Sequence, residues 1–354
     1  MMTTKVFQRV LATFLVVAAI FLANGVAQAD PYDDIQKYTA QINQNPNDAK
    51  AYNNRGEAYR LLKQYERAIQ DYDKAIQLNP NLYQAYNNRG ISYSNLGQHE
   101  RAIQDFNKVI QINPNVALAY GNRGNAYRNL GDYKRAIQDY DKAIQLNPNY
   151  FEAYYNRGNA YYDLGQYELA IQDFSTAIQL NPNLYQAYGN RGLAYYNLGQ
   201  KERAIKDYDK AIQLNPNLAE AYNNRGNTYD DLGQKERAIQ DYDKAIQLNP
   251  NYAEAYYNRG NAYRNLGDYK RAIQDYDKAI QLNPNLYQAY NNRGLAYYNL
   301  GQYERAIKDY SKAIQLNPNY FEAYYNRGLA YKKFGNMTVA QADFARAREL
   351  GYNG

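Results

Sequence analysis

A segment of thirty-four residues is repeated nine times along this 354-residue chain, with small changes between copies. A fixed period in this range indicates a stack of supersecondary units, each of which buries its core against its neighbours. No spacer rich in Gly, Ser or Pro interrupts the copies, so we expect one continuous domain. The period is marked by nine prolines, at Pro46, Pro80, Pro114, Pro148, Pro182, Pro216, Pro250, Pro284 and Pro318.

Each repeat is predicted to form two helices. We number its positions from 1 to 34, beginning three residues after each proline. Small and apolar residues at positions 3, 4, 8, 11 and 14, and again at 20, 21, 24, 27 and 28, have helical spacing. Gly at position 15 in eight repeats, and Asn-Pro at positions 31 and 32, are typical helix-ending residues. The predicted repeats are 49–82, 83–116, 117–150, 151–184, 185–218, 219–252, 253–286, 287–320 and 321–354.

The residues before each first helix indicate how that helix begins. The Asn at position 33, as in Asn81, is followed three residues later by Glu or Gln at seven of the nine junctions, as in Gln84. This is capping-box spacing, so we expect the position-33 Asn to cap the next helix.

The repeat closely resembles the tetratricopeptide repeat. The resemblance rests on Tyr at position 4, Gly at 8, Tyr at 11, Ala at 20, Tyr or Phe at 24, Ala at 27 and Pro at 32, and it covers residues 49–354. It implies an all-α fold, a right-handed superhelical solenoid of helix-turn-helix repeats with a concave groove. It is much less specific for function, because one fold serves many functions.

The first forty-eight residues differ from the repeats. Lys5 and Arg9 precede an apolar run, and an Ala-Gln-Ala sequence ends at Ala29, so residues 1–29 read as a cleaved secretory signal peptide. An uncleaved membrane anchor is the alternative, although the run is short for a bilayer span. Cleavage implies a periplasmic or extracellular protein. Residues 30–48 put Tyr38 at position 24 and Ile42 at position 28, which predicts a capping half repeat.

Composition argues against catalysis and nucleic-acid binding. The chain has no Cys, and its one His, His99, falls where other repeats carry Tyr, Lys or Met. We find no metal-ligand cluster, phosphate loop or nucleophile elbow, and we expect no cofactor. A net charge of +6 spread over the whole precursor is too small to indicate a nucleic-acid-binding surface. The 44 Tyr include 24 at positions 4, 11 and 24, so most of them are expected in the core.

An Asn stands at position 6 of every repeat. A side-chain amide both donates and accepts hydrogen bonds, so such a row could bind peptide backbone without reading sequence. It is similar to the asparagine ladder in the superhelix of O-linked N-acetylglucosamine transferase. A structural hydrogen bond within the helix stack is the alternative. The carboxylate clamp of chaperone-binding repeats is excluded, because no repeat has Lys at position 5 or Arg at position 6. The row is Asn54, Asn88, Asn122, Asn156, Asn190, Asn224, Asn258, Asn292 and Asn326.

The first helices vary at positions 5, 9 and 12, whereas the second helices are nearly copies. In the family that the repeat resembles these first-helix positions face the groove. Tyr and Arg are residue types that anchor interfaces, so they could select a partner's side chains. Solvated groove walls and neutral drift are the alternatives. The candidate residues are Tyr155, Tyr162, Tyr196, Tyr257, Tyr298, Arg60, Arg128 and Arg264.

Every repeat also carries Arg at position 7 and Asp at position 23, where the family commonly has Leu and Tyr. Examples are Arg55 with Asp71 and Arg191 with Asp207. The guanidinium is a planar fork suited to a carboxylate, so we predict partly buried ion pairs that fix helix packing.

These features favour an exported, non-enzymatic scaffold that binds an extended polypeptide in a concave groove. No stable membrane insertion is expected after signal cleavage. The alternatives are a structural protein that self-associates through its exposed repeat ends, above all the C-terminal repeat, and a groove that binds a glycan. A further interpretation of the C-terminal repeat is that its last helix frays.

Overall fold

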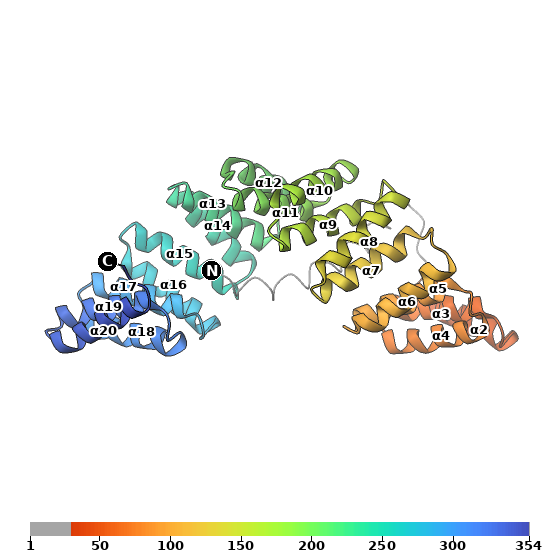
Figure 1. Ribbon diagram of the computed structural model, residues 1–354, viewed down its shortest axis with the longest axis horizontal. Helices are drawn as coiled ribbons and strands as arrows, with labels where there is room; N and C mark the ends of the chain where they lie inside the picture. The colour runs from red at the N-terminus through yellow and green to blue at the C-terminus, as the bar shows by residue number, and fades with distance from the viewer. Residues whose placement is uncertain (1–29, 354) are drawn as a thin grey trace. The chain divides into compact units, whose positions relative to one another are not determined.

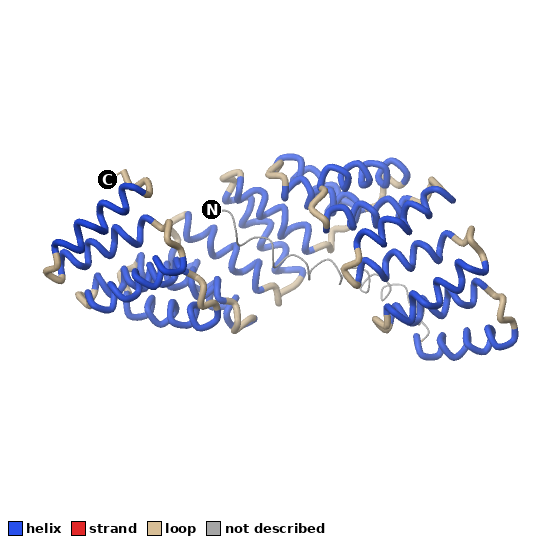
Figure 2. The backbone as a smooth tube through the Cα atoms, turned by 60° about the horizontal axis from the view of Figure 1, so that its bottom comes forward, coloured by secondary structure: helices blue, strands red, loops and turns tan. Residues whose placement is uncertain are grey.

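The described part of the chain is entirely helical. The computed structural model describes residues 30–353, which form nineteen helices and no strand (Figure 1, Figure 2). The predicted signal peptide, residues 1–29, lies outside the described residues. The chain divides into two compact parts, one ending at Asn156 and the other beginning at Arg157, and each part is a stack of helix pairs. The predicted class, an all-α solenoid of helix pairs, is confirmed. Its right-handed winding stays a prediction.

The two helices of each repeat begin at the same positions throughout and end at the same positions, except that α20 ends one residue earlier. The first helices span positions 1–13: α3 Ala49–Leu61, α5 Tyr83–Asn95, α7 Ala117–Asn129, α9 Phe151–Asp163, α11 Tyr185–Asn197, α13 Ala219–Asp231, α15 Ala253–Asn265, α17 Tyr287–Asn299 and α19 Phe321–Lys333. The second helices begin at position 17: α4 Tyr65–Leu78, α6 His99–Ile112, α8 Tyr133–Leu146, α10 Tyr167–Leu180, α12 Lys201–Leu214, α14 Lys235–Leu248, α16 Tyr269–Leu282, α18 Tyr303–Leu316 and α20 Met337–Glu349. A single helix, α2 Pro31–Gln44, packs on α3 as the predicted half repeat.

The core is a column of small residues around one aromatic ring per repeat. The residues at positions 20, 24 and 27, such as Ala204, Tyr208 and Ala211, are buried. The ring lies against the first helix at position 8, where a Cβ on Gly192 would come within 2.9 Å of Cε1 of Tyr208. Only glycine therefore lets the two helices approach this closely.

A left-handed residue at position 15 ends each first helix. At Gly97, φ is +72°, and the N–H of the following residue, Gln98, donates to the carbonyl of Tyr93 at 2.8 Å. This 6→1 bond is the Schellman helix ending. In the first repeat Lys63 adopts the same conformation at φ +58°, which costs energy because its Cβ crowds the backbone there.

The capping-box prediction is wrong. The first-helix N-cap is position 34, as in Leu82, and no side chain caps that helix. Instead Oδ1 of the position-31 Asn, such as Asn79, accepts from the N–H of the position-33 Asn, Asn81, at 3.1 Å. The Asn-Pro-Asn turn thus satisfies its own backbone as an Asx turn, which competes with capping the next helix.

The C-terminus folds back on the last repeat. The ring of Tyr352 stacks on Tyr325 with centroids 4.2 Å apart and also lies 6.2 Å from the ring of Phe321. The last helix, α20, is described through Glu349, and its N-terminal end exposes Met337.

Candidate binding face of the first helices

Neighbouring first helices touch one another directly within each part. Contacts join α3 to α5 and α5 to α7, and in the second part they run from α11 through α13, α15 and α17 to α19. Among the described helices, the second helices pack mainly against first helices, and no two second helices make contacts as extensive as those between first helices. The first helices therefore line the inner side of each stack. We call the surface formed by positions 5, 6, 9 and 12 the first-helix face.

The position-6 amides are partly committed to the neighbouring repeat. Nδ2 of Asn122 donates to Asn87 at 3.1 Å, and Nδ2 of Asn258 donates to Asn223 at 3.1 Å. The same kind of bond is made by Asn88 to Asn53, Asn190 to Asn159, Asn292 to Asn261 and Asn326 to Asn291. These six Asn residues therefore make the structural hydrogen bond within the helix stack that was the alternative prediction. It leaves one N–H and the carbonyl of an amide such as Asn122 for other partners.

The other three members of the Asn row lack this bond. Asn54 is exposed and accepts from its neighbour Asn53 at 3.2 Å. Asn156 is buried, and its Oδ1 has no partner. The side chain of Asn224 makes no hydrogen bond with a described residue, because Gly189 and Leu193 stand where an acceptor would be.

One of the residues predicted to select a partner's side chains is buried. Tyr162 is 6% exposed, its hydroxyl accepts from Nδ2 of Asn197 at 2.8 Å, and its ring meets Tyr167 edge-on. The sequence predicts that this side chain faces a partner, but the neighbouring repeat covers it. A polar tip on a large ring makes Tyr suited to such a buried, hydrogen-bonded place.

The remaining tyrosines of the set are half-buried. The hydroxyl of Tyr196 donates to Asp231 in the next repeat at 2.6 Å. The hydroxyl of Tyr257 accepts from Asn292, and burial raises its pKa. Tyr298 packs edge-on against Tyr303, and Tyr155 is also half-buried.

The three arginines of the set differ in how they are held. Nε and Nη2 of Arg60 both bind Glu57, at 2.8 and 2.5 Å. Arg264 donates to Asn265 at 3.2 Å. Arg128 makes no ion pair with a described residue, so its guanidinium is the least committed of the three.

The predicted ion pairs are present in all nine repeats, and each is two-pronged. In the first, Nε and Nη2 of Arg55 bind the two carboxylate oxygens of Asp71 at 2.8 and 2.7 Å. In Arg191–Asp207 the distances are 2.7 and 2.8 Å. Sequence reasoning missed a third contact: Nη1 reaches position 25 of the preceding repeat, as from Arg191 to Ser175 at 2.9 Å. This third contact is made in at least eight of the nine repeats, where the Arg joins three helices.

Aromatic rings flank these guanidinium groups. The ring centroids of Tyr86, at position 4, and Tyr93, at position 11, lie 5.6 and 5.9 Å from Cζ of Arg89. The hydrogen bond to Asp139 raises the pKa of the equivalent Arg123, so that guanidinium stays charged. The position-24 tyrosines are core as predicted. Those at positions 4 and 11 flank the ion pairs, and some of them, such as Tyr86 and Tyr229, are also buried.

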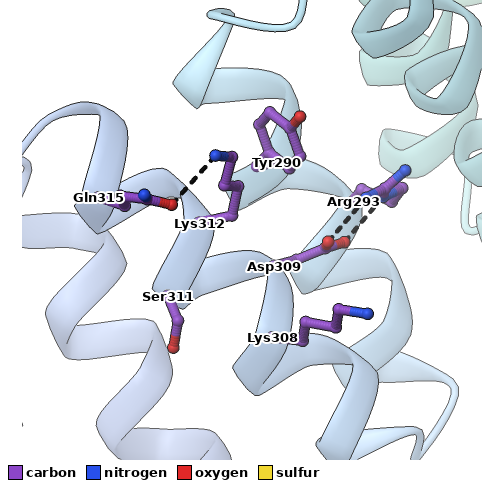
Figure 3. A pocket seen from close by; sticks show the side chains of 7 residues that line it. All are labelled: Tyr290, Arg293, Lys308, Asp309, Ser311, Lys312 and Gln315. Carbon is purple, nitrogen blue, oxygen red and sulfur yellow. Dashed lines mark hydrogen bonds and ion pairs between the residues drawn. The ribbon is translucent and has the colours of Figure 1, made fainter.

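Two cavities lie away from the first-helix face. One, of about 330 Å³, lies beside Arg293 and Asp309 and is lined mainly by α18, where Lys312 donates to Gln315 (Figure 3). The other, of about 480 Å³, lies at the turn that includes Gly97 and Arg101. Within residues 30–353 no group of His, Cys, Asp or Glu is placed to hold a metal ion. None of the described helices is both long and apolar enough to cross a bilayer.

Family profiles match the repeats one by one. A profile described as "Tetratricopeptide repeat" matches residues 49–82, 83–116, 151–184, 185–218, 219–252 and 253–286, which is more than half of the chain. The chain belongs to the tetratricopeptide repeat family. Related profiles of the same family match residues 106–138, 124–165, 275–308, 296–335 and 321–350 of this tetratricopeptide repeat chain.

Solved tetratricopeptide structures resemble the chain over different lengths. The Cut9–Hcn1 hetero-tetramer of the APC/C is 19% identical, with a TM-score of 0.57 over 83% of this chain and 58% of that one. MamA is 33% identical, with a TM-score of 0.44 over 47% and 91%. YrrB, titled a TPR protein with an unusual peptide-binding site, is 28% identical, with a TM-score of 0.45 over 52% and 95%. No curated protein matches the chain.

Proposed function

We propose that this chain is a non-enzymatic binder of extended polypeptide, exported from the cytoplasm, and that it binds through the first-helix face. One observation carries the proposal: the variable positions 5, 9 and 12 lie together where first helices meet, whereas the second helices repeat one sequence. The segment Arg-Ala-Ile-Gln-Asp-Tyr-Asp-Lys-Ala-Ile-Gln-Leu-Asn-Pro-Asn is identical at 67–81, 135–149, 237–251 and 271–285. Membership of a repeat family built from stacked helix pairs supports a role in protein interaction.

The chemistry of the face suits a polypeptide backbone. Amides such as Asn122 and Asn258 are held in place by one N–H, and each keeps a carbonyl and a second N–H. A neutral donor and acceptor at a fixed spacing matches the alternating C=O and N–H groups of an extended chain. Side chains of the partner would be selected between these amides by Arg128 and Tyr298.

Selection from a random peptide library on residues 30–354, followed by calorimetric titration, tests the proposal. We expect Arg128→Ala to weaken a selected peptide about tenfold, since one lost charge-assisted contact contributes about 1.5 kcal/mol. The matched control is Lys142→Ala on the second helix α8, which removes the same charge from the opposite side of the repeat. Equal effects of the two substitutions, or failure to select any binding peptide, would reject the first-helix face.

The proposal of export rests on residues 1–29. Expression of the full chain in a bacterium, followed by fractionation, should place it outside the cytoplasm with Asp30 as the new N-terminus. Retention of Met1 in a membrane fraction would show an anchor instead.

Self-association through the C-terminal repeat is the rival function. Tyr352 already covers the rings of Tyr325 and Phe321, which reduces the apolar surface at that end. Light scattering of residues 30–354 distinguishes the two: a monomer is expected, and a concentration-dependent oligomer would favour self-association. A saccharide array would detect a glycan-binding face.

A further inference from the structure

A four-residue hydrogen-bond cluster fills the space between the first helices of repeats seven and eight. The hydroxyl of Tyr276 donates to Oδ1 of Asn261 at 2.8 Å. Nδ2 of Asn292 donates to the same oxygen at 2.9 Å and to the hydroxyl of Tyr257 at 3.1 Å. Positions 5, 9 and 24 of one repeat and position 6 of the next thus satisfy one another.

Repeat five keeps two members of this cluster and has lost the other two. Gly189 stands at position 5 and Leu193 at position 9, and this is the one repeat in the sequence with no polar side chain at either position. The remaining members have no partners. The hydroxyl of Tyr208 is buried and makes no hydrogen bond, and Tyr208 as a whole is 1% exposed. Asn224, at position 6 of the next repeat, has no side-chain hydrogen bond with a described residue.

The space left by the missing side chain is open. A Cβ placed on Gly189 would meet no atom within 4 Å. Gly121, at position 5 of repeat three, differs, because there Tyr150 at position 34 fills the space and would lie 2.9 Å from an added Cβ. Repeat five has the smaller Leu218 at position 34. We call the open space beside Gly189 the Gly189 notch.

The groups around the notch specify the chemistry of an occupant. Asp207, next to Tyr208 in the sequence, is already bound by Arg191 at 2.7 Å, so the notch offers no free counterion to a charged group. A wholly apolar occupant would leave the side-chain amide of Asn224 unsatisfied, which is costly. In four other repeats the position-6 amide donates to an Asn carbonyl at position 5 of the preceding repeat, as Asn258 does to Asn223.

We propose that the Gly189 notch is a specificity pocket that receives a carboxamide side chain, Asn or Gln, of a bound polypeptide. The ligand's carbonyl accepts from Nδ2 of Asn224, in the place that an Asn at position 5 takes elsewhere in the chain. This inference rests on the proposed function, since it assigns one residue of the polypeptide bound on the first-helix face.

The substitution Gly189→Asn tests the pocket because it supplies the missing carboxamide from within the chain. Asn occupies position 5 in four repeats, so the variant is expected to fold, which circular dichroism would verify. The probes are three capped tripeptides, acetyl-Ala-X-Ala-N-methylamide, with Asn, Leu or Asp as X. The readout is the NMR signal of the Asn224 side-chain amide in residues 30–354, assigned by its loss in Asn224→Gln.

We expect the Asn peptide alone to shift the Asn224 signal, and we expect Gly189→Asn to abolish that shift. The control Lys206→Gln, on the exposed side of α12, should leave it unchanged. Equal shifts with all three peptides, no shift with the Asn peptide, or a shift that survives Gly189→Asn would each overturn the pocket. If the peptides move the signals of Asn122 or Asn258 but not Asn224, the pocket fails and the binding face stands. If they move none of these signals, both fail.

Discussion

Arg225 and Asp241 face each other across the two helices of repeat six in a two-pronged ion pair, at 2.8 and 2.6 Å. The third nitrogen of the same guanidinium binds Asp209 of the preceding repeat. The carboxylate of Asp241 is nearly buried, whereas that of Asp209 is half exposed. One side chain therefore closes a repeat and joins it to its neighbour.

We expect Asp241→Ala to lower the free energy of unfolding by about 3 kcal/mol. Breaking a buried pair leaves a guanidinium uncompensated, which typically costs about 3–5 kcal/mol, and Asp209 limits the loss. The control is Asp243→Ala, whose half-exposed carboxylate binds Arg259 and should contribute less than about 1 kcal/mol. Urea unfolding followed by circular dichroism measures both. Similar losses for the two variants would contradict a packing role for the buried pair.

Removing the hydroxyl of the position-24 Tyr should affect stability differently in repeats seven and five. Tyr276→Phe deletes a buried bond to Asn261 and should lower stability by about 1 kcal/mol, because the Asn oxygen loses a donor. Tyr208→Phe deletes a hydroxyl that has no partner and should be neutral or stabilising. Thermal melts of the two variants make the comparison. A larger loss in Tyr208→Phe would show that its hydroxyl is bonded in solution.

Repeat four offers the reverse experiment. It has Asn159 at position 9 but Phe174 at position 24, so the amide oxygen that accepts from Asn190 lacks the tyrosine donor seen in repeat seven. We expect Phe174→Tyr to raise stability by about 0.5–1.5 kcal/mol through a restored hydrogen bond. The midpoint of urea unfolding should rise, and a fall would mean that the added hydroxyl overpacks the core.

Lys63 is strained in the first repeat. Lys63→Gly should raise stability by about 0.5–1 kcal/mol, because relief of the left-handed backbone exceeds the extra entropy of glycine in the unfolded chain. Gly97→Lys places the same strain in the next repeat and should lower stability by a similar amount. Differential scanning calorimetry checks the signs, and opposite signs at both sites would refute the explanation.

Stability should fall at alkaline pH. Burial raises the pKa of the position-24 hydroxyls, such as Tyr242 and Tyr276, above their ordinary value of 10.0. Below pH 10 both states keep the proton, so these groups give no pH dependence. Above it the unfolded state loses the proton while the folded state retains it, which lowers stability by about 1.4 kcal/mol per pH unit for each such Tyr. Urea midpoints from pH 8 to 11 measure the slope, which Tyr276→Phe should reduce. A slope that does not change would exclude Tyr276 as a contributor.

The fold could be predicted from the sequence because the same pattern of residues occurs in every repeat. Nine copies with the same helix-ending and apolar positions leave one packing scheme, and the Arg55–Asp71 and Arg191–Asp207 pairs followed from the co-occurrence of two residue types. The candidate site was harder to predict. The sequence predicts that the side chains at positions 6 and 12 bind a partner, but many of them already make hydrogen bonds to a neighbouring repeat. Positions 9 and 24 vary together in only some repeats. Ile91 stands with Phe106 and Leu329 with Phe344, but Asn159 stands with Phe174 and Leu193 with Tyr208, so the Tyr276–Asn261 bond could not be predicted from this comparison.

The sequence by itself determined the helices, their C-terminal ends and the buried column, because those depend on local spacing and on residues within one repeat. Only the tertiary structure decided which side chains are satisfied between repeats. Tyr162 is buried because Asn197 of the next repeat covers it, and Asn224 lacks an acceptor because Gly189 and Leu193 precede it. Such contacts join residues about one period apart, and their geometry depends on how closely neighbouring first helices approach, which no single repeat specifies.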